Sequence, residues 1–539
     1  MDVLKRRANA GGPARAVAPA TTIAGVVVVA SLLAACGGGA TLPPPLTGSS
    51  GRIDPVYDFM VSYPDTEIII DGLPHRGLEI DLAIRFADST VRDADPLFSA
   101  EASVVEVTAG GVSRPFQPTG PIGFEGTLKG DVLATGLFGT IQVGNAALLI
   151  DLTGAMQPGR RRIAGAAGLF GLDDPGTFTA IKRRRYLVAG TDLQVIGKVS
   201  VLDVRYESRF SVENALETIS SDPFARVEDG RPFVVNAYTF DNLQGLDPAG
   251  AFTTAFQYTT GARSNPHDVA VLSDPDAAAL SAGGATGASP GGLAFVPRYE
   301  PPFNDVAVID LADGTIVDAI DLAPYARNGD RLPRPDQVLL HDGLLYVTIQ
   351  DVNRNFTEYR TGRVVIIDPE ARSVTGVVDL QGQNPFQSLA AIPDTGLIYV
   401  GLAGIFKGLL PQALTGGVEA VDPVTRTASV VVDDDLLGGN VASAAVHSAT
   451  RGFCVVTDSA YRNFVKMFDP TTGDVLGTIH ETTNLIAALE ADGDGWLIVA
   501  EAGYFEPRLL VFDALTGQAL ASLPVQLPPF SLATLTRSL

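Results

Sequence analysis

The sequence predicts an all-β protein, and two observations carry that prediction. Glycine (57 residues) and proline (36 residues) recur between short apolar runs rich in valine and threonine, which favours many short strands joined by turns. From about residue 185 onward, an apolar strand-like run ending in aspartate recurs along the chain. The aspartates that end these runs are Asp203, Asp247, Asp310, Asp368, Asp422, Asp469 and Asp513. Their spacing of 44 to 63 residues is typical of the blades of a β-propeller.

Residues 1–35 are predicted to be a signal peptide. Cationic side chains precede a short apolar segment, TTIAGVVVVASLLAA, which ends in small residues at position 35. A helix that spans a bilayer needs about 20 apolar residues, and this segment stops before that length. A signal that is removed is therefore favoured over a permanent transmembrane helix.

Leu33-Ala34-Ala35-Cys36 resembles the lipobox of bacterial lipoproteins. The resemblance implies that the chain is cut before Cys36, that a diacylglycerol is attached to its thiol, and that an acyl chain such as palmitate can follow on its amine. Two or more acyl chains hold a protein stably on a membrane. Gly37, in place of an aspartate after the cysteine, favours the outer membrane, on its periplasmic or surface side. The alternative is an ordinary signal that happens to be followed by a cysteine.

Three segments are predicted to follow before the repeats. Residues 36–51 are rich in glycine, proline and serine and are expected to form a flexible tether. Residues 52–155 contain short alternating runs separated by turn residues, which predict a small Ig-like β-sandwich. Residues 156–184 hold two clusters of arginine and are interpreted as a basic connector.

Residues 185–539 are predicted to form a seven-bladed propeller. Two further strands precede each aspartate motif and one follows it, so each blade has four strands, and the aspartate side chain caps the turn by accepting backbone N–H groups. The first copy lacks an innermost strand, whereas Phe530 to Leu535 follows the last complete blade. This C-terminal strand is expected to pair with the strand near Arg185 and close the ring, which leaves few exposed strand edges.

The repeats resemble the YVTN-repeat, YncE-like family of bacterial propellers. Leu344-Leu-Tyr-Val347 and Leu397-Ile-Tyr-Val400 carry the apolar-Tyr-Val pattern, and apolar-Asp turns follow them. The resemblance implies a propeller over residues 185–539. It leaves the function open, because propellers occur as enzymes, binding modules and scaffolds.

Charge and motifs narrow the possible chemistry. The net charge of −23 disfavours nucleic acid as a partner. The five histidines form no HExxH or clustered Cys/His pattern, and no phosphate-binding glycine loop is present. The sequence therefore predicts no catalytic residue, cofactor or metal ligand, and Cys454, in an apolar run, is expected to be a buried thiol.

A candidate ligand face follows from propeller topology. The loops that lead into the innermost strands and those that join second to third strands open on one side, and the long loops 350–360 and 404–411 are expected there. The polar candidates on this face are Asn265, His267, Asp268, Asp336, Gln337, Gln387, Asn440 and Asn484. The alternative is that these side chains only cap a narrow channel.

The sequence as a whole predicts a lipid-anchored cell-envelope protein that acts as a binding module. Its partner would be an envelope protein, a glycan or a small ligand, with the membrane reached through Cys36. One alternative is an enzyme at the channel mouth, such as a lactonase-like hydrolase or a metal- or quinone-dependent oxidoreductase. Three carboxylate or histidine ligands converging near His267 and Asp268 would favour the enzyme. The other alternative is a structural envelope scaffold.

Overall fold

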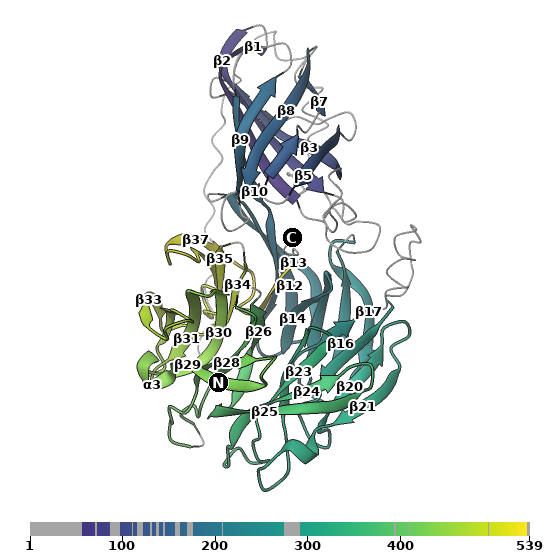
Figure 1. The fold of residues 1–539 in the computed structure, drawn as a ribbon, viewed down its shortest axis with the longest axis vertical. Helices are drawn as coiled ribbons and strands as arrows, with labels where there is room; N and C mark the ends of the chain where they lie inside the picture. The colour runs from purple at the N-terminus through teal and green to yellow at the C-terminus, as the bar shows by residue number, and fades with distance from the viewer. Residues whose placement is uncertain are drawn as a thin grey trace, which may run out of the picture. The chain divides into compact units, whose positions relative to one another are not determined.

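The computed structural model confirms the all-β prediction (Figure 1). It describes residues 56–535 except for 71–72, 87–97, 110–111, 116–121, 130–131, 136–138, 144–145, 157–161, 170–175, 207–208, 249, 274–290, 393–394, 409 and 494. The predicted signal peptide, the tether and Cys36 lie outside the described residues. Two short helices, η2 (Ala323–Tyr325) and α3 (Asp434–Leu437), are the only named elements in the described part that are not strands.

The first ten strands form one antiparallel sheet that closes on itself. The strands are β1 (Val56–Ile70), β2 (Leu73–Phe86), β3 (Phe98–Ala109), β4 (Val112–Pro115), β5 (Ile122–Lys129), β6 (Val132–Thr135), β7 (Gly139–Val143), β8 (Ala146–Met156), β9 (Arg162–Leu169) and β10 (Gly176–Lys182). Pairing runs β2-β1-β10-β9-β8-β6-β5-β3, and β3 pairs with β2 again. Val61 lies opposite both Ile80 and Phe178, and all three side chains are buried.

This closed sheet corrects two predictions. The two separate sheets of an Ig-like sandwich are replaced by a single ring of paired strands. The predicted connector 156–184 contains β9 and β10, and β10 completes the ring by pairing with β1. The sequence of β9, RIAGAAGL, is dominated by alanine and glycine, so it lacks the β-branched residues that signal a strand.

The rest of the chain forms seven four-stranded antiparallel sheets within the described residues. Each is given from its first strand to its fourth. Sheet 1 is β38 (Pro529–Thr534), β11 (Arg184–Thr191), β12 (Gly197–Tyr206) and β13 (Arg209–Ile219); sheet 2 is β14 (Pro223–Glu228), β15 (Arg231–Asn236), β16 (Asn242–Asp247) and β17 (Thr253–Thr259); sheet 3 is β18 (Ala270–Leu272), β19 (Leu293–Pro297), β20 (Asp305–Asp310) and β21 (Ile316–Asp321). Sheet 4 is β22 (Pro335–His341), β23 (Leu344–Ile349), β24 (Thr361–Asp368) and β25 (Ser373–Gln383); sheet 5 is β26 (Pro385–Ile392), β27 (Leu397–Leu402), β28 (Gly417–Asp422) and β29 (Thr427–Asp433). Sheet 6 is β30 (Asn440–Ser448), β31 (Arg451–Thr457), β32 (Asn463–Phe468) and β33 (Val475–Thr482); sheet 7 is β34 (Ile486–Ala491), β35 (Trp496–Glu501), β36 (Arg508–Asp513) and β37 (Ala519–Pro524).

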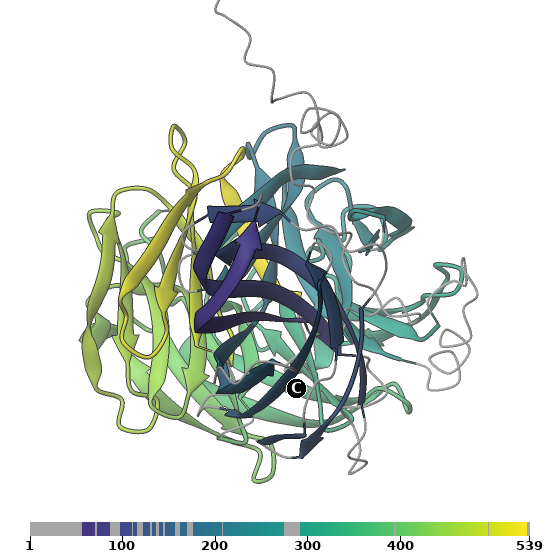
Figure 2. The same ribbon diagram turned by 90° about the horizontal axis from the view of Figure 1, so that it is seen from above.

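The sheets follow one another in sequence order, from teal to yellow in Figures 1 and 2. The fourth strands are the most exposed and the second strands are almost wholly buried: every residue of β35 is buried, whereas β21 exposes five of its six residues. The first strands of neighbouring sheets contact each other, as β22 does β26 and β34 does β38. The apolar runs of the second and third strands are therefore covered by neighbouring sheets.

The C-terminal strand joins the first sheet to the last. β38 pairs with β11, with Tyr186 opposite Thr534 and Val188 opposite Leu532, as the sequence predicts. Leu532 and Tyr186 share one apolar cluster with Trp496 of sheet 7. The two ends of the repeat region are thus held together by backbone hydrogen bonds and by a shared core.

Six of the seven recurrent aspartates lie at the turn between third and fourth strands, and Asp203 lies within β12. The carboxylates that accept backbone N–H groups two residues on are Asp310, Asp368, Asp422, Asp469 and Asp513. Asp368, for example, accepts from Glu370 and Ala371 at 2.9 Å each. The capping role is thereby confirmed for these five. Asp203 differs, because it is buried and lies 3.7 Å from Arg183, one of the arginines that the sequence placed in the connector.

Candidate functional site

His267 and Asp336 form a buried pair between sheets 3 and 4. Nδ1 of His267 donates to Asp336 Oδ1 at 2.7 Å, and the other carboxylate oxygen accepts from the backbone N–H of Gln387 in sheet 5 at 2.8 Å. The imidazole stacks on Tyr299, with ring centroids 4.6 Å apart. Asp336 is fully buried. One carboxylate therefore links three successive sheets.

Asp268 makes a second link around the same ring. Its Oδ1 accepts from Arg226 Nε of sheet 2, and its Oδ2 accepts from the backbone N–H of Val338 in sheet 4 at 2.8 Å. The same guanidinium donates to Gln337 Oε1 at 3.1 Å. Burial raises the pKa of Asp268, and Arg226 opposes that rise.

Similar side-chain bonds join the remaining neighbouring first strands. The side chains of Ser388, Glu490 and Ser531 accept from the backbone N–H groups of Ala444, Thr534 and Ala225, respectively. The imidazole of His447 bonds the backbone carbonyl of Asp492. We call this circle of bonds, together with those of Asp268 and Asp336, the polar belt. It satisfies backbone groups that twisted neighbouring sheets leave unpaired.

The predicted ligand residues are only partly brought together. His267, Asp268, Asp336, Gln337 and Gln387 lie in or beside the polar belt. The three asparagines lie apart from it and from each other: Asn265 bonds Tyr238, Asn440 bonds Gln412, and Asn484 bonds Glu501. In the described part of the chain, no group of three histidine, cysteine, aspartate or glutamate side chains could hold a metal ion.

A central cavity of about 990 Å³ lies along the first strands. All seven sheets contribute to its wall, sheet 3 through Asp268 just before β18. The wall includes three carboxyl groups, those of Asp268, Glu228 and Glu490, beside alanine, serine and leucine side chains. Burial, reinforced by Asp268, raises the pKa of Glu228 to about 8. Burial, reinforced by Asp492, raises the pKa of Glu490 to about 7.

These raised pKa values predict a stability that falls with increasing pH. A glutamate in an unfolded chain titrates near pH ~4.3, so the fold holds both protons more tightly than the unfolded chain does. Their contribution is full below that pH and is lost as the pH rises through about 7 and 8. As the pH is raised from 6 to 9, the Tm of the double variant Glu228→Gln, Glu490→Gln should therefore fall by less than the Tm of the native chain. The control is Glu370→Gln on an exposed turn; parallel curves for all three proteins would contradict the assignment.

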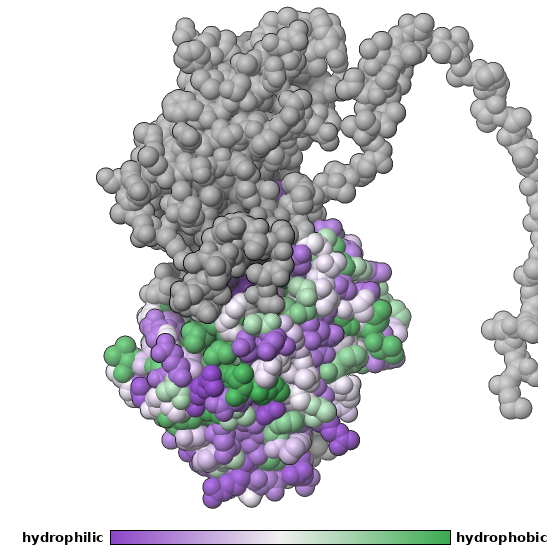
Figure 3. All heavy atoms as spheres, turned by 90° about the vertical axis from the view of Figure 1, so that its right-hand side faces the viewer, coloured by the Kyte–Doolittle hydropathy of each residue, from purple (hydrophilic) through white to green (hydrophobic). Residues whose placement is uncertain are grey.

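Exposed aromatic side chains, which the sequence analysis did not single out, lie on the second-to-third loops, which it placed on the candidate ligand face. Within the described residues, every exposed phenylalanine and tyrosine lies in a loop between the second and third strands of a sheet. They are Tyr238, Phe240, Phe406, Tyr461, Tyr504 and Phe505. Exposed Leu193 and Val195 occupy the same loop of sheet 1. Figure 3 shows one side of the molecule, where apolar groups lie among hydrophilic ones.

These loops open on one side, because the first strands of a ring of antiparallel sheets run in the same direction. We call the surface formed by the second-to-third loops, residues 192–196, 237–241, 298–304, 350–360, 403–416, 458–462 and 502–507, the loop face. Adjacent loops touch: Tyr461 donates to the carbonyl of Lys407 at 3.3 Å. Sequence patterns could not show this gathering, since loops have no hydrophobic period.

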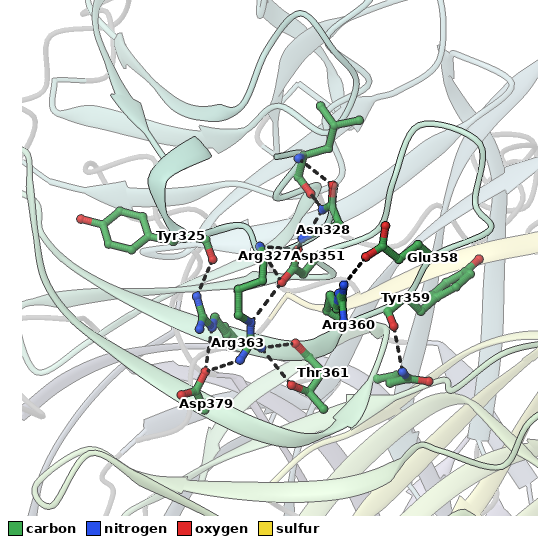
Figure 4. Close-up of polar contacts among 12 residues, drawn as sticks. Tyr325, Arg327, Asn328, Asp351, Glu358, Tyr359, Arg360, Thr361, Arg363 and Asp379 are labelled. Carbon is green, nitrogen blue, oxygen red and sulfur yellow. Dashed lines mark hydrogen bonds and ion pairs between the residues drawn. The ribbon is translucent and has the colours of Figure 1, made fainter. Parts of the chain in front are cut away.

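Beside the loop face, sheet 4 carries a dense network of charges (Figure 4). Fully buried Asp351 accepts from the backbone N–H groups of Arg327 and Asn328 at 2.8 and 2.9 Å. Arg327 also donates to the side chain of Thr361 at 2.8 Å, and Arg363 donates to Asp379 at 2.7 Å. The loop before β22 is thereby fixed to the loop between β23 and β24.

Two further expectations concern the cysteines and the membrane. Cys454 is a buried free thiol, and burial raises its pKa, which agrees with the expected role in the core. Cys36 lies outside the described residues. No helix in the described ranges has the length and apolar character to cross a bilayer.

Comparisons with known proteins give structural neighbours only. No protein-family model matches the chain, and no curated protein matches it. The neighbours include a periplasmic gluconolactonase of Pseudomonas aeruginosa, with 16% identity, a TM-score of 0.46, and coverage of 65% of this chain and 99% of that one. A protein from Lactobacillus plantarum has 12% identity and a TM-score of 0.47, with coverage of 65% and 99%. Both are β-propeller proteins, and the activity in the first name is that protein's own.

Proposed function

We propose that this chain is a lipid-anchored binding module of the cell envelope, built as a seven-bladed β-propeller that follows an N-terminal closed sheet in the sequence. The observation that carries the proposal is the loop face, where all six exposed phenylalanine and tyrosine side chains of the described residues gather. Aromatic side chains left in water on one surface are typical of interaction sites. The partner is an envelope protein or glycan.

The polar belt supports binding at the loop face rather than chemistry at the channel mouth. His267 and Asp336 are occupied by each other, and the carboxylate of Asp268 is occupied by Arg226 and a backbone N–H group. A general base must reach a proton of the substrate, and these groups already link neighbouring sheets. Their role in this proposal is to hold the propeller together.

The anchor supplies the location. Two acyl chains on Cys36 would hold the protein on a membrane, and residues 36–51 would separate the anchor from the folded part. An anchored module meets its partner within a thin layer of the envelope, which raises the effective concentration of the two.

A photo-cross-linking experiment in intact cells tests the proposal. A photoreactive amino acid replaces Phe505 on the loop face, and as a control it replaces Val424 in a turn at the opposite end of the sheets; the native side chains are 89% and 88% exposed. We expect a discrete cross-linked product of higher mass at position 505 and none at 424. Equal cross-linking at both positions, or none at 505, would count against a binding role for the loop face.

A further inference from the structure

Two loops of sheet 4 carry a local excess of positive charge in an acidic protein. Residues 326–334, which lead into β22, and residues 350–360, which join β23 to β24, contain five arginines and three carboxylates, an excess of two positive charges. The whole chain has a net charge of −23. A locally positive surface on such an acidic chain is a candidate site for binding an anion.

The carboxylates in these loops are used internally. Asp351 accepts from the N–H groups of residues 327 and 328, Asp330 Oδ2 accepts from the backbone N–H of Arg354 at 2.8 Å, and Glu358 lies 2.5 Å from Arg360. Figure 4 shows Asp351 and Glu358 facing their partners. These bonds hold the two loops together, and they leave the three carboxylates with partners inside the loops.

Arg334 fixes the inner side of this arrangement. Its side chain is 2% exposed, and its guanidinium lies 5.0 Å from the ring centroid of Tyr299 and 4.2 Å from that of Phe356. Nη1 donates to Glu300 at 2.9 Å, while its buried Nε has no hydrogen-bond partner in the described part of the chain. The charge of Arg334 is thus balanced by Glu300, just as Asp351 balances Arg327 and Glu358 balances Arg360.

Arg331 and Arg354 form the outer side. Both are exposed, and neither guanidinium has a partner among the described residues. The two loops that carry them are joined, because the backbone N–H of Arg354 donates to Asp330, the residue before Arg331.

We propose that Arg331 and Arg354 bind an oxyanion group, a carboxylate or a phosphate, on the ligand of the loop face. Guanidinium groups pair with both oxyanions through two parallel N–H bonds. The charge of −23 repels a long polyanion, so the ligand is one that presents an isolated anionic group. This inference rests on the proposed function, since it assigns chemistry to part of the same face.

Calorimetric titration of the purified full chain tests it, with pyrophosphate and citrate as probes and sodium chloride at equal ionic strength as the blank. We expect saturable binding of at least one probe, weakened about tenfold or more in the double variant Arg331→Ala, Arg354→Ala, because a tenfold loss is about 1.4 kcal/mol, less than the loss of two charged hydrogen-bonding groups. Binding of pyrophosphate alone supports a phosphate group, and binding of citrate alone supports a carboxylate. Binding of both supports an oxyanion site.

The matched control is Arg372→Ala, a partly exposed arginine in the turn between β24 and β25, at the opposite end of sheet 4. It should leave binding unchanged. Absence of saturation with either probe, or an equal loss in the control, would overturn the oxyanion site. A discrete cross-link at position 505 together with no oxyanion binding would remove this inference and leave the proposed function standing.

Discussion

Replacing Asp336 with alanine should destabilise the protein by about 3 to 5 kcal/mol, because two buried hydrogen bonds to a carboxylate are worth about 1.5 to 3 kcal/mol each. The side chain is fully buried and accepts from His267 at 2.7 Å and from the backbone of Gln387 at 2.8 Å. Its removal leaves both donors buried without an acceptor. The effect should spread beyond sheet 4, because the carboxylate joins sheets 3, 4 and 5.

The protein offers its own probe for this measurement. Its single tryptophan, Trp496, is fully buried in sheet 7, so urea unfolding followed by fluorescence reports on a sheet remote from position 336. The control is Asp342→Asn in the same sheet, since asparagine tolerates the φ of 47° at this turn, and the native carboxylate is 83% exposed beside His341 and should contribute little. If the urea midpoint of Asp336→Ala equalled that of the control, the polar belt would not stabilise the seven-sheet part of the chain.

The variant Cys36→Ser should lose the acyl groups that are proposed to hold the protein on the membrane. If the lipobox resemblance holds, the acyl chains are attached through Cys36, and one or no chain cannot hold a protein stably on a bilayer. We expect the native protein to sediment with membranes and to carry the mass of its acyl groups. The serine variant should lose that acyl mass from position 36 and should no longer be processed as a lipoprotein.

Cys454→Ser is the matched control for this experiment. Cys454 is buried in sheet 6, so its replacement should leave fractionation and acyl mass unchanged. Membrane association of Cys36→Ser with no loss of acyl mass would remove the lipoprotein assignment. The fold of the described residues would be unaffected by that outcome.

The repeated part of the fold could be predicted because one signal recurs. Each aspartate that follows an apolar run marks the same turn, and Asp368 and Asp513 cap theirs as expected. The closing strand could also be inferred, because sheet 1 lacked a partner strand that the C-terminus supplied. Because the same pattern occurs several times along the chain, the structural unit can be recognised even where one copy is irregular.

Other features depend on contacts that a single sequence does not display. The strand β9 is rich in alanine and glycine and becomes a strand only because β8 and β10 pair with it. His267 and Asp336 were recognised as polar residues of one region, but their mutual bond joins positions 69 residues apart. The exposed aromatic residues of the loop face have no period by which to be grouped.

Thiol accessibility in the envelope tests the binding role of the loop face most directly. Tyr461→Cys and Phe505→Cys place a thiol on that face, and Val424→Cys places one at the opposite end of the sheets. Each variant is labelled with a maleimide in isolated envelopes and again after purification in detergent. The account predicts slow labelling at positions 461 and 505 in envelopes, fast labelling of both after purification, and fast labelling at 424 throughout. Equal labelling rates in envelopes and in purified protein at all three positions would contradict it.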